Sequence, residues 1–234
     1  MKKPLNIIVT GASRGIGFDT VLELSKNPNN QIYALSRNAE KLQLLRQSAF
    51  SNNVQVIPFD LTDYDQKKFD QFLKLSNHID VLINNAGLLY SEPFEELSLE
   101  KWKAIFEVNL FGIVQLIKGL LPKLKRSTAA HILNIGSMGG FQGSSKFPGL
   151  SAYSASKAAL ANLTECLAQE FVDYNIKVNC LALGAVQTEM LAEAFPGYQA
   201  PVSSLSMSSY IAWFAQKGHE FHNGKIIPVA LSTP

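Results

Sequence analysis

The chain has 234 residues and a formal net charge of +2 at pH 7; 47% of its residues are hydrophobic and 17% are charged. This composition excludes a disordered chain, because disorder needs low hydrophobicity and high net charge. The near-neutral charge gives no electrostatic footprint for nucleic acid. The length fits a single domain spanning residues 1–234.

The sequence also predicts no membrane segment and no disulfide framework. No apolar run approaches the about 18–20 residues of a membrane helix, and the N-terminal apolar run is too short for a signal peptide. Cys166 and Cys180 are too few for a disulfide scaffold, and we expect both to be small core residues. We therefore expect a cytoplasmic protein with reduced thiols.

Apolar, β-prone runs alternate with helical patterns along the whole chain. We expect strands at 5–10, 31–36, 54–58, 79–84, 131–136, 176–182 and 225–230, and helices at about 15–26, 38–48, 64–75, 99–125, 152–173 and 206–217. Short, continuously apolar strands suit a sheet that is covered on both faces. The alternation predicts an α/β fold: a Rossmann-type, doubly wound parallel sheet of about seven strands with helices on both faces.

The first expected strand runs straight into TGASRGIG at residues 10–17, whose glycines are Gly11, Gly15 and Gly17. A tight turn after a strand needs glycine, and so does close approach of the backbone to a pyrophosphate. The following helix would present its N-terminal amides to the phosphates. A lone glycine motif can also be a plain turn into a helix, but the strand before it and the helix after it favour a dinucleotide site.

The second expected strand ends at Ser36 and Arg37, where a dinucleotide-binding fold reads the adenosine ribose. An acidic side chain there would accept a hydrogen bond from the 2′-hydroxyl of NAD. A neutral serine and a cationic arginine instead suit a 2′-phosphate, and Arg14 is placed to reach the same group. The alternative is that both arginines are ordinary surface charges. We expect NADP(H) to be preferred, with NAD(H) possible.

Tyr153 and Lys157 lie four residues apart in YSASK, on a strong helical pattern. Positions i and i+4 share one helix face, so both side chains can point at one site. A phenol, with a pKa of about 10, is a poor acid near neutral pH. A nearby ammonium favours the phenolate, so we expect Lys157 to lower the pKa of Tyr153. This spacing is common on helix surfaces and becomes specific only together with the glycine turn.

Four further motifs accompany these two in order: Asp60 in FDLTD, NNAG at 84–87, Asn109 in EVNLFG, and Ser137 in NIGSMGG. With all six, the chain resembles the short-chain dehydrogenase/reductase family, in its short single-domain branch, over nearly the whole length.

The resemblance implies a role for each catalytic position. Tyr153 would exchange a proton with the substrate oxygen, Lys157 would hold the nicotinamide ribose, and Ser137 would hydrogen-bond the carbonyl. Asn109 would hold a water that relays protons to Lys157. The implied cofactor contacts are Gly11, Ser13, Arg14, Gly15, Ile16, Gly17, Arg37, Asp60, Leu61, Asn85, Ala86, Gly87, Tyr153, Lys157, Gly184, Val186 and Thr188.

Three departures from the family pattern stand out. Leu183-Gly184 replaces the usual Pro-Gly, which removes a rigid turn. The stretch between Ser137 and Tyr153 is longer than the family commonly shows, and its extra residues lie in the Gly/Ser-rich loop 136–151. The last segment reads ALSTP instead of Asp-Gly-Gly, near the usual subunit contacts.

The sequence therefore predicts an NADP(H)-dependent carbonyl reductase or alcohol dehydrogenase. In the segment 189–205, where the family closes over the substrate, there is no arginine or lysine, and apolar surface comes from Met190, Leu191, Phe195 and Tyr198. These features favour an uncharged or apolar carbonyl or alcohol substrate. No metal is expected, and His219 and His222 are interpreted as surface residues.

Two expectations concern assembly and the alternative function. A homodimer or homotetramer is implied by the resemblance and by the long helices 99–125 and 152–173, which carry apolar residues on more than one face. The alternative function is a regulatory protein that senses a dinucleotide without turnover. Loss of Tyr153 or Lys157 would have supported that alternative, and both are present.

Overall fold

The computed structural model describes residues 4–63 and 66–231. Its main sheet has seven parallel strands in the order β3-β2-β1-β4-β5-β6-β9. Each strand begins and ends within two residues of its predicted run, so the α/β prediction is confirmed. The strands are β1 (Asn6–Thr10), β2 (Gln31–Ser36), β3 (Val54–Pro58), β4 (Val81–Asn84), β5 (Ala130–Ser137), β6 (Ile176–Leu183) and β9 (Ile226–Val229).

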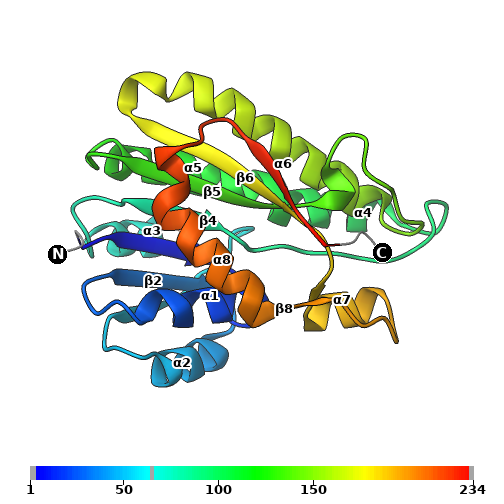
Figure 1. Cartoon of the computed structure of the whole chain (residues 1–234), viewed down its shortest axis with the longest axis horizontal. Helices are drawn as coiled ribbons and strands as arrows, with labels where there is room; N and C mark the ends of the chain where they lie inside the picture. The colour runs from blue at the N-terminus through cyan, green and yellow to red at the C-terminus, as the bar shows by residue number, and fades with distance from the viewer. Residues whose placement is uncertain (1–3, 64–65, 232–234) are drawn as a thin grey trace.

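Helices cover both faces of this sheet (Figure 1). One face is covered by α1 (Gly15–Ser25), α2 (Ala39–Ser48) and α8 (Ser204–Lys217). The other is covered by α3 (Gln66–Leu73), α5 (Gly112–Leu124) and α6 (Ser151–Glu170), with α4 (Leu99–Phe106) leading into α5. Residues 64 and 65, at the start of one predicted helix, lie outside the described residues.

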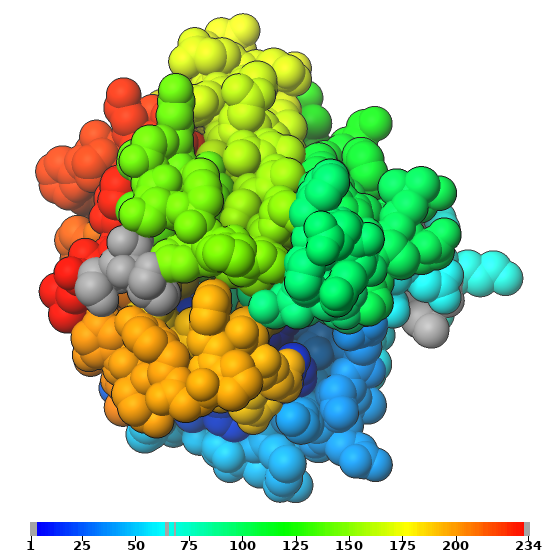
Figure 2. Space-filling view, turned by 90° about the vertical axis from the view of Figure 1, so that its right-hand side faces the viewer, coloured from blue at the N-terminus to red at the C-terminus, as the bar shows by residue number. Residues whose placement is uncertain are grey.

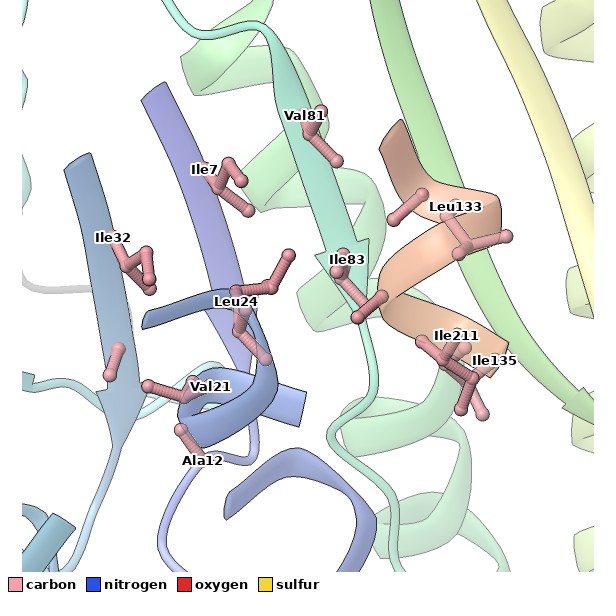
Figure 3. Packing of buried hydrophobic residues seen from close by; sticks show 14 of the residues in the cluster. Ile7, Ala12, Val21, Leu24, Ile32, Val81, Ile83, Leu133, Ile135 and Ile211 are labelled. Atoms are coloured by element: carbon pink, nitrogen blue, oxygen red, sulfur yellow. The ribbon is translucent and has the colours of Figure 1, made fainter. Parts of the chain in front are cut away.

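The side chains of β1 show how the sheet divides the core. Ile7 and Val9 belong to the cluster under α1 and α8, whereas Ile8 packs on the opposite face with α5. Figure 3 shows Ile7 with Leu24 of α1 and neighbouring apolar side chains from the first face. Successive strand residues point to opposite faces, so a strand buried on both sides must be apolar throughout.

A π-helical turn, Glu107–Phe111, joins α4 to α5. The resulting run, Leu99–Leu124, is long and apolar enough to cross a membrane by length and composition alone, so the expectation that no run reaches this length is wrong. The run is apolar because part of it is a core helix: Ile113, Leu116 and Leu120 are fully buried in the protein. It therefore carries no membrane assignment.

Three short elements after β6 do not follow from the sequence pattern. β7 (Val186–Gln187) pairs with β8 (Val202–Ser203), and α7 (Glu189–Ala194) lies between them. Leu183, which replaces the expected proline, is the last residue of β6, and the amide of Gly184 donates to the carbonyl of Val229 on β9 at 3.0 Å. The turn after β6 is thus held by backbone hydrogen bonds rather than by a proline ring.

The cysteine prediction is half right. Cys180 is buried in β6, but Cys166 is exposed, because its position on α6 faces outward. The expectation that Cys166 belongs to the core is therefore wrong.

The histidines at the other end of the sheet are less exposed than predicted. His222 stacks on Phe214, with ring centroids 5.7 Å apart, and His219 lies 5.4 Å from the ring of His131. His131 is fully buried, with Nδ1 2.9 Å from the carbonyl oxygen of Ala215. Burial lowers the pKa of His131 to about 4, so this ring is neutral in the folded protein at pH 7.

Candidate active site

A cavity opens at the carboxyl end of the sheet, where β1, β2, β4, β5 and β6 end. Figure 2 looks onto this side: a hollow lies beside the orange segment that contains α7, and dark blue atoms from the N-terminal part of the chain are visible in it. Most of the predicted site residues line the cavity: Gly11, Ser13, Arg14, Gly15, Ile16, Arg37, Asp60, Leu61, Asn85, Ala86, Gly87, Ser137, Tyr153, Lys157, Gly184, Val186 and Thr188. Gly17 and Asn109 are predicted residues that do not line it.

The glycine turn needs glycine at each of its three positions. Gly11 and Gly15 have φ values of +68° and +54°, which L side chains rarely adopt. A Cβ on Gly17 would lie 2.4 Å from both Asn85 Nδ2 and the carbonyl oxygen of Gly11. The N-cap of α1 is Arg14, whose side chain makes no capping hydrogen bond. This arrangement fits a pyrophosphate, because the backbone is accessible and no side chain takes the first helical amides.

Hydrogen bonds between Thr10 and the segment that follows β4 hold the glycine turn in place. The hydroxyl of Thr10 accepts hydrogen bonds from the amides of Asn85 and Ala86 at 3.0 and 3.1 Å. Asn85 Nδ2 donates to the carbonyl oxygen of Thr10 at 3.0 Å. Asn85 therefore supports the turn as well as lining the cavity. The sequence reasoning did not assign Thr10, although its place directly before Gly11 was the available signal.

At the end of β2, the hydroxyl of Ser36 donates to that of Ser13 at 2.8 Å. Arg37 is exposed at the rim of the cavity and has no ion-pair partner among the described residues. Arg14 is engaged elsewhere: its guanidinium pairs with Glu189 at 3.1 Å and with Glu193 at 3.3 Å, both on α7. In this structure Arg37 therefore has an unpaired guanidinium among the described residues, whereas Arg14 would have to leave Glu189 and Glu193 to bind the 2′-phosphate.

The predicted catalytic groups come from α6 and the end of β5. Lys157 is buried, and its Nζ donates to the carbonyl oxygen of Ile135 at 2.8 Å. The same Nζ lies 5.8 Å from the centroid of the Tyr153 ring. Ser137 Oγ accepts from the amide of Gly139 at 3.1 Å, and the Ser137 hydroxyl also hydrogen-bonds Tyr153. These contacts place a phenol, a hydroxyl and an ammonium in one cavity.

The pKa values of Tyr153 and Lys157 differ from what the sequence predicts. Burial raises the pKa of Tyr153, and its hydrogen bond with Ser137 opposes this rise. Burial also lowers the pKa of Lys157, to about 8. The expectation that Lys157 lowers the pKa of Tyr153 is therefore wrong in this structure, because desolvation disfavours both charged forms and the ammonium is directed at Ile135. The phenol is protonated at neutral pH.

Asn109 lies in the π-helical turn and is fully buried. Its Oδ1 accepts from the amide of Leu88 at 2.8 Å, and its Nδ2 donates to the carbonyl oxygen of Leu88 at 3.0 Å and to Ser156 Oγ at 2.9 Å. The side chain thus ties the segment after β4 to α6 and does not face the cavity. Sequence reasoning missed Ser156, which lies directly before Lys157 in YSASK.

Beyond Tyr153 and Ser137 the cavity is apolar. Its walls come from the segment after β4, the loop after β5 and α7, and include Leu88, Leu89, Met138, Phe147, Leu150, Met190, Leu191, Ala194 and Phe195. Of the predicted apolar contacts, Tyr198 does not line the cavity. In the described parts of the chain, no group of three or more His, Cys, Asp or Glu residues is arranged to hold a metal ion.

Comparisons with known proteins agree with this geometry. The model of the short chain dehydrogenase family matches residues 5–199. An oxidoreductase of Botryotinia fuckeliana, BOA17, is 32% identical over 212 residues, covering 89% of this chain and 74% of that one. An uncharacterized oxidoreductase of Bacillus subtilis, YusZ, is 31% identical over 222 residues, with coverages of 91% and 78%. The chain belongs to the short-chain dehydrogenase family, a family of oxidoreductases.

Solved structures share the whole fold. The RhlG/NADP complex of Pseudomonas aeruginosa has a TM-score of 0.82 and 26% identity, covering 97% of this chain and 94% of that one. The L-sorbose reductase of Gluconobacter frateurii, solved with NADPH and L-sorbose, has a TM-score of 0.83 and 22% identity, with coverages of 97% and 95%. The second likeness concerns the fold alone.

Proposed function

We propose that this protein is an NADP(H)-dependent oxidoreductase that interconverts a carbonyl compound and its alcohol. The observation that carries the proposal is the convergence of Tyr153, Ser137 and Lys157 beside the glycine turn in one cavity. A protein that only senses a dinucleotide needs the glycine turn but not a phenol and a hydroxyl at its nicotinamide end.

In the reductive direction each group has a defined task. Bound NADPH would supply the hydride. Ser137 would donate a hydrogen bond to the substrate oxygen as negative charge develops there, and would keep its own proton. Tyr153, protonated because burial raises its pKa, then transfers its proton to that oxygen. Lys157, whose Nζ donates to the carbonyl oxygen of Ile135, would hold the nicotinamide ribose and place positive charge near the reacting oxygen.

The proposed preference for NADP(H) rests on the end of β2. Ser36 offers no carboxylate to accept from a 2′-hydroxyl, and Arg37, beside it, is a cation with no ion-pair partner in the described part of the chain. An arginine matches phosphate geometry. RhlG, which is 26% identical to this chain, forms a complex with NADP.

The test is the loss of NADPH absorbance with a panel of uncharged carbonyl compounds. Tyr153→Phe should lower kcat about 10²- to 10⁴-fold while leaving the Kd of NADPH nearly unchanged, because only the acid is removed. Tyr198→Phe is the matched control, since Tyr198 lies outside the cavity lining. Wild-type kcat in Tyr153→Phe would refute the assignment. Tight NADPH binding with no turnover on any carbonyl would favour the sensing function instead.

We also propose that residues 1–234 form one domain that assembles as a homodimer or homotetramer. The support is the exposed apolar surface of the α4–α5 run, where Leu99 is 63% and Phe111 48% exposed. Exposed side chains of this size favour burial against a partner, and closed two-fold symmetry is the commonest arrangement of like subunits.

A further inference from the structure

Two phenylalanines from separate segments meet at the apolar end of the cavity. Phe147 lies in the loop after β5, and Phe195 directly follows α7. Their ring centroids are 6.0 Å apart, with an angle of 78° between the ring planes. Both side chains line the cavity, so this edge-to-face pair joins the long loop to α7 across its apolar end.

Hydrogen bonds between residues of the same loop hold the segment that carries Phe147. Lys146 Nζ donates to the carbonyl oxygens of Gly139 and Phe141 at 2.8 and 2.7 Å, and to Ser144 Oγ at 2.9 Å. The hydroxyl of Ser144 in turn hydrogen-bonds the carbonyl oxygens of Met138 and Phe141. Met138 and Gly139 directly follow Ser137. The position of Phe147 is therefore tied to the turn that presents the proposed carbonyl-binding hydroxyl.

Hydrogen bonds at both ends of α7 hold the segment that carries Phe195. Thr188 caps α7 by accepting from the amide of Leu191 at 3.2 Å, and the amide of Phe195 donates to the carbonyl oxygen of Leu191 at 2.8 Å. Farther along, Gln187 Oε1 accepts from the amide of Ala200 at 2.8 Å. These bonds hold the helix and the segment after it, so Phe195 is presented against Phe147 from a defined backbone.

The side chains around the phenylalanine pair favour an apolar ligand. Apart from the phenylalanine pair, the described side chains around this end are aliphatic or methionine: Leu88, Leu89, Met138, Leu150, Met190 and Leu191. The charged residues of the cavity lining are Arg14 and Glu189, which pair with each other, Arg37 and Asp60, which follow β2 and β3, and the buried Lys157. A carboxylate or a polyhydroxylated chain placed here would lose hydration without gaining partners.

We propose that Phe147 and Phe195 determine substrate specificity, and that the substrate is an aryl-substituted carbonyl compound or the corresponding benzylic alcohol. The aromatic ring packs against the phenylalanine pair while the carbonyl oxygen reaches Ser137 and Tyr153. This inference rests on the proposed oxidoreductase function and adds its substrate class.

The experiment compares three ketones of similar size: acetophenone, cyclohexyl methyl ketone and 4-acetylbenzoate. We expect kcat/KM to be roughly two- to tenfold higher for the phenyl than for the cyclohexyl compound, as aromatic pairing predicts. The carboxylate should be the poorest of the three. Phe147→Leu and Phe195→Leu keep the site apolar but remove the rings, so each should abolish the phenyl preference. Phe221→Leu, at a 75% exposed residue outside the cavity lining, is the control and should keep it.

Equal rates on the two neutral ketones, or a phenyl preference that survives both substitutions, would overturn the inference. Calorimetric binding of the three ketones to the enzyme–NADP⁺ complex separates this inference from the proposed function. If phenyl-selective binding is lost in Phe195→Leu but no ketone is reduced, the specificity assignment stands and the proposed reaction fails. If the ketones are reduced without phenyl selectivity, the reaction stands and the specificity assignment fails.

Discussion

Replacing Arg37 by aspartate should weaken NADPH far more than NADH. The guanidinium is exposed at the rim of the cavity, next to the hydrogen-bonded pair Ser36 and Ser13, and has no competing ion pair among the described residues. A hydrogen bond to a charged group contributes about 1.5–3 kcal/mol. That free energy corresponds to a preference of roughly 10- to 150-fold for the phosphorylated cofactor. Aspartate also repels the 2′-phosphate, so the ratio should fall by at least this factor.

The structure assigns less of this preference to Arg14. Its two pairs with Glu189 and Glu193 compete with a phosphate, and exposed ion pairs are worth about 0.2–1 kcal/mol each. Replacing both glutamates by glutamine should therefore free Arg14 and raise the NADPH preference only a few-fold.

The assay is kcat/KM for NADPH and NADH with one substrate at constant ionic strength, because exposed charges are screened by salt. Arg46→Asp, an equal change of charge on α2 outside the cavity lining, is the control and should leave the ratio unchanged. A wild-type enzyme that favours NADH, or a ratio that Arg37→Asp does not move, would show that Arg37 is an ordinary surface charge.

Three more predictions follow from other parts of the molecule. Gly17→Ala places a Cβ 2.4 Å from the backbone of Gly11, so the Kd of NADPH should rise at least tenfold in a fluorescence titration, with a loss of about 1–3 kcal/mol in stability. His131, with its pKa lowered from 6.5 to about 4, stays neutral when folded, whereas the unfolded chain takes up a proton first as the pH falls. Its contribution to stability in urea denaturation should therefore be about 2 kcal/mol smaller at pH 5 than at pH 7.5. His131→Gln should remove this part and leave the smaller contribution of His219, whose pKa burial also lowers. Light scattering at micromolar concentration should give a particle mass that is a multiple of 25.7 kDa. Phe111→Ser should reduce this mass, whereas Phe50→Ser, at another exposed phenylalanine, should leave it unchanged. A stable 25.7 kDa particle in the wild type would contradict the assembly.

The sequence was sufficient for the sheet and for the location of the site, and the reason is physical. A parallel strand buried on both faces must be apolar along its length, so each strand is visible as a short run, and its end marks the edge where ligands bind. Gly11, Ser137 and Gly184 lie at or just beyond such ends. Their convergence in one cavity follows from parallel pairing alone.

Other features depend on contacts between residues far apart in the sequence. The partners of Arg14 lie 175 and 179 positions away, and no local pattern indicates them. β7 and β8 have two residues each, too few for periodicity, and are defined by pairing with each other. The π-helical turn that directs Asn109 toward Leu88 has an ordinary helical sequence, so helix propensity does not distinguish it.

The hydrogen bond between Gly184 and Val229 has a consequence for how the enzyme matures. The part of the cavity around the glycine turn is built from β1, α1 and β4, which are synthesised before β9. The turn at Gly184 gains its backbone partner only when β9 has been synthesised and has docked beside β6. A nascent chain that lacks β9 therefore has the glycine turn but no backbone partner for the turn at Gly184. We therefore expect oxidoreductase activity to depend on the docking of β9 beside β6.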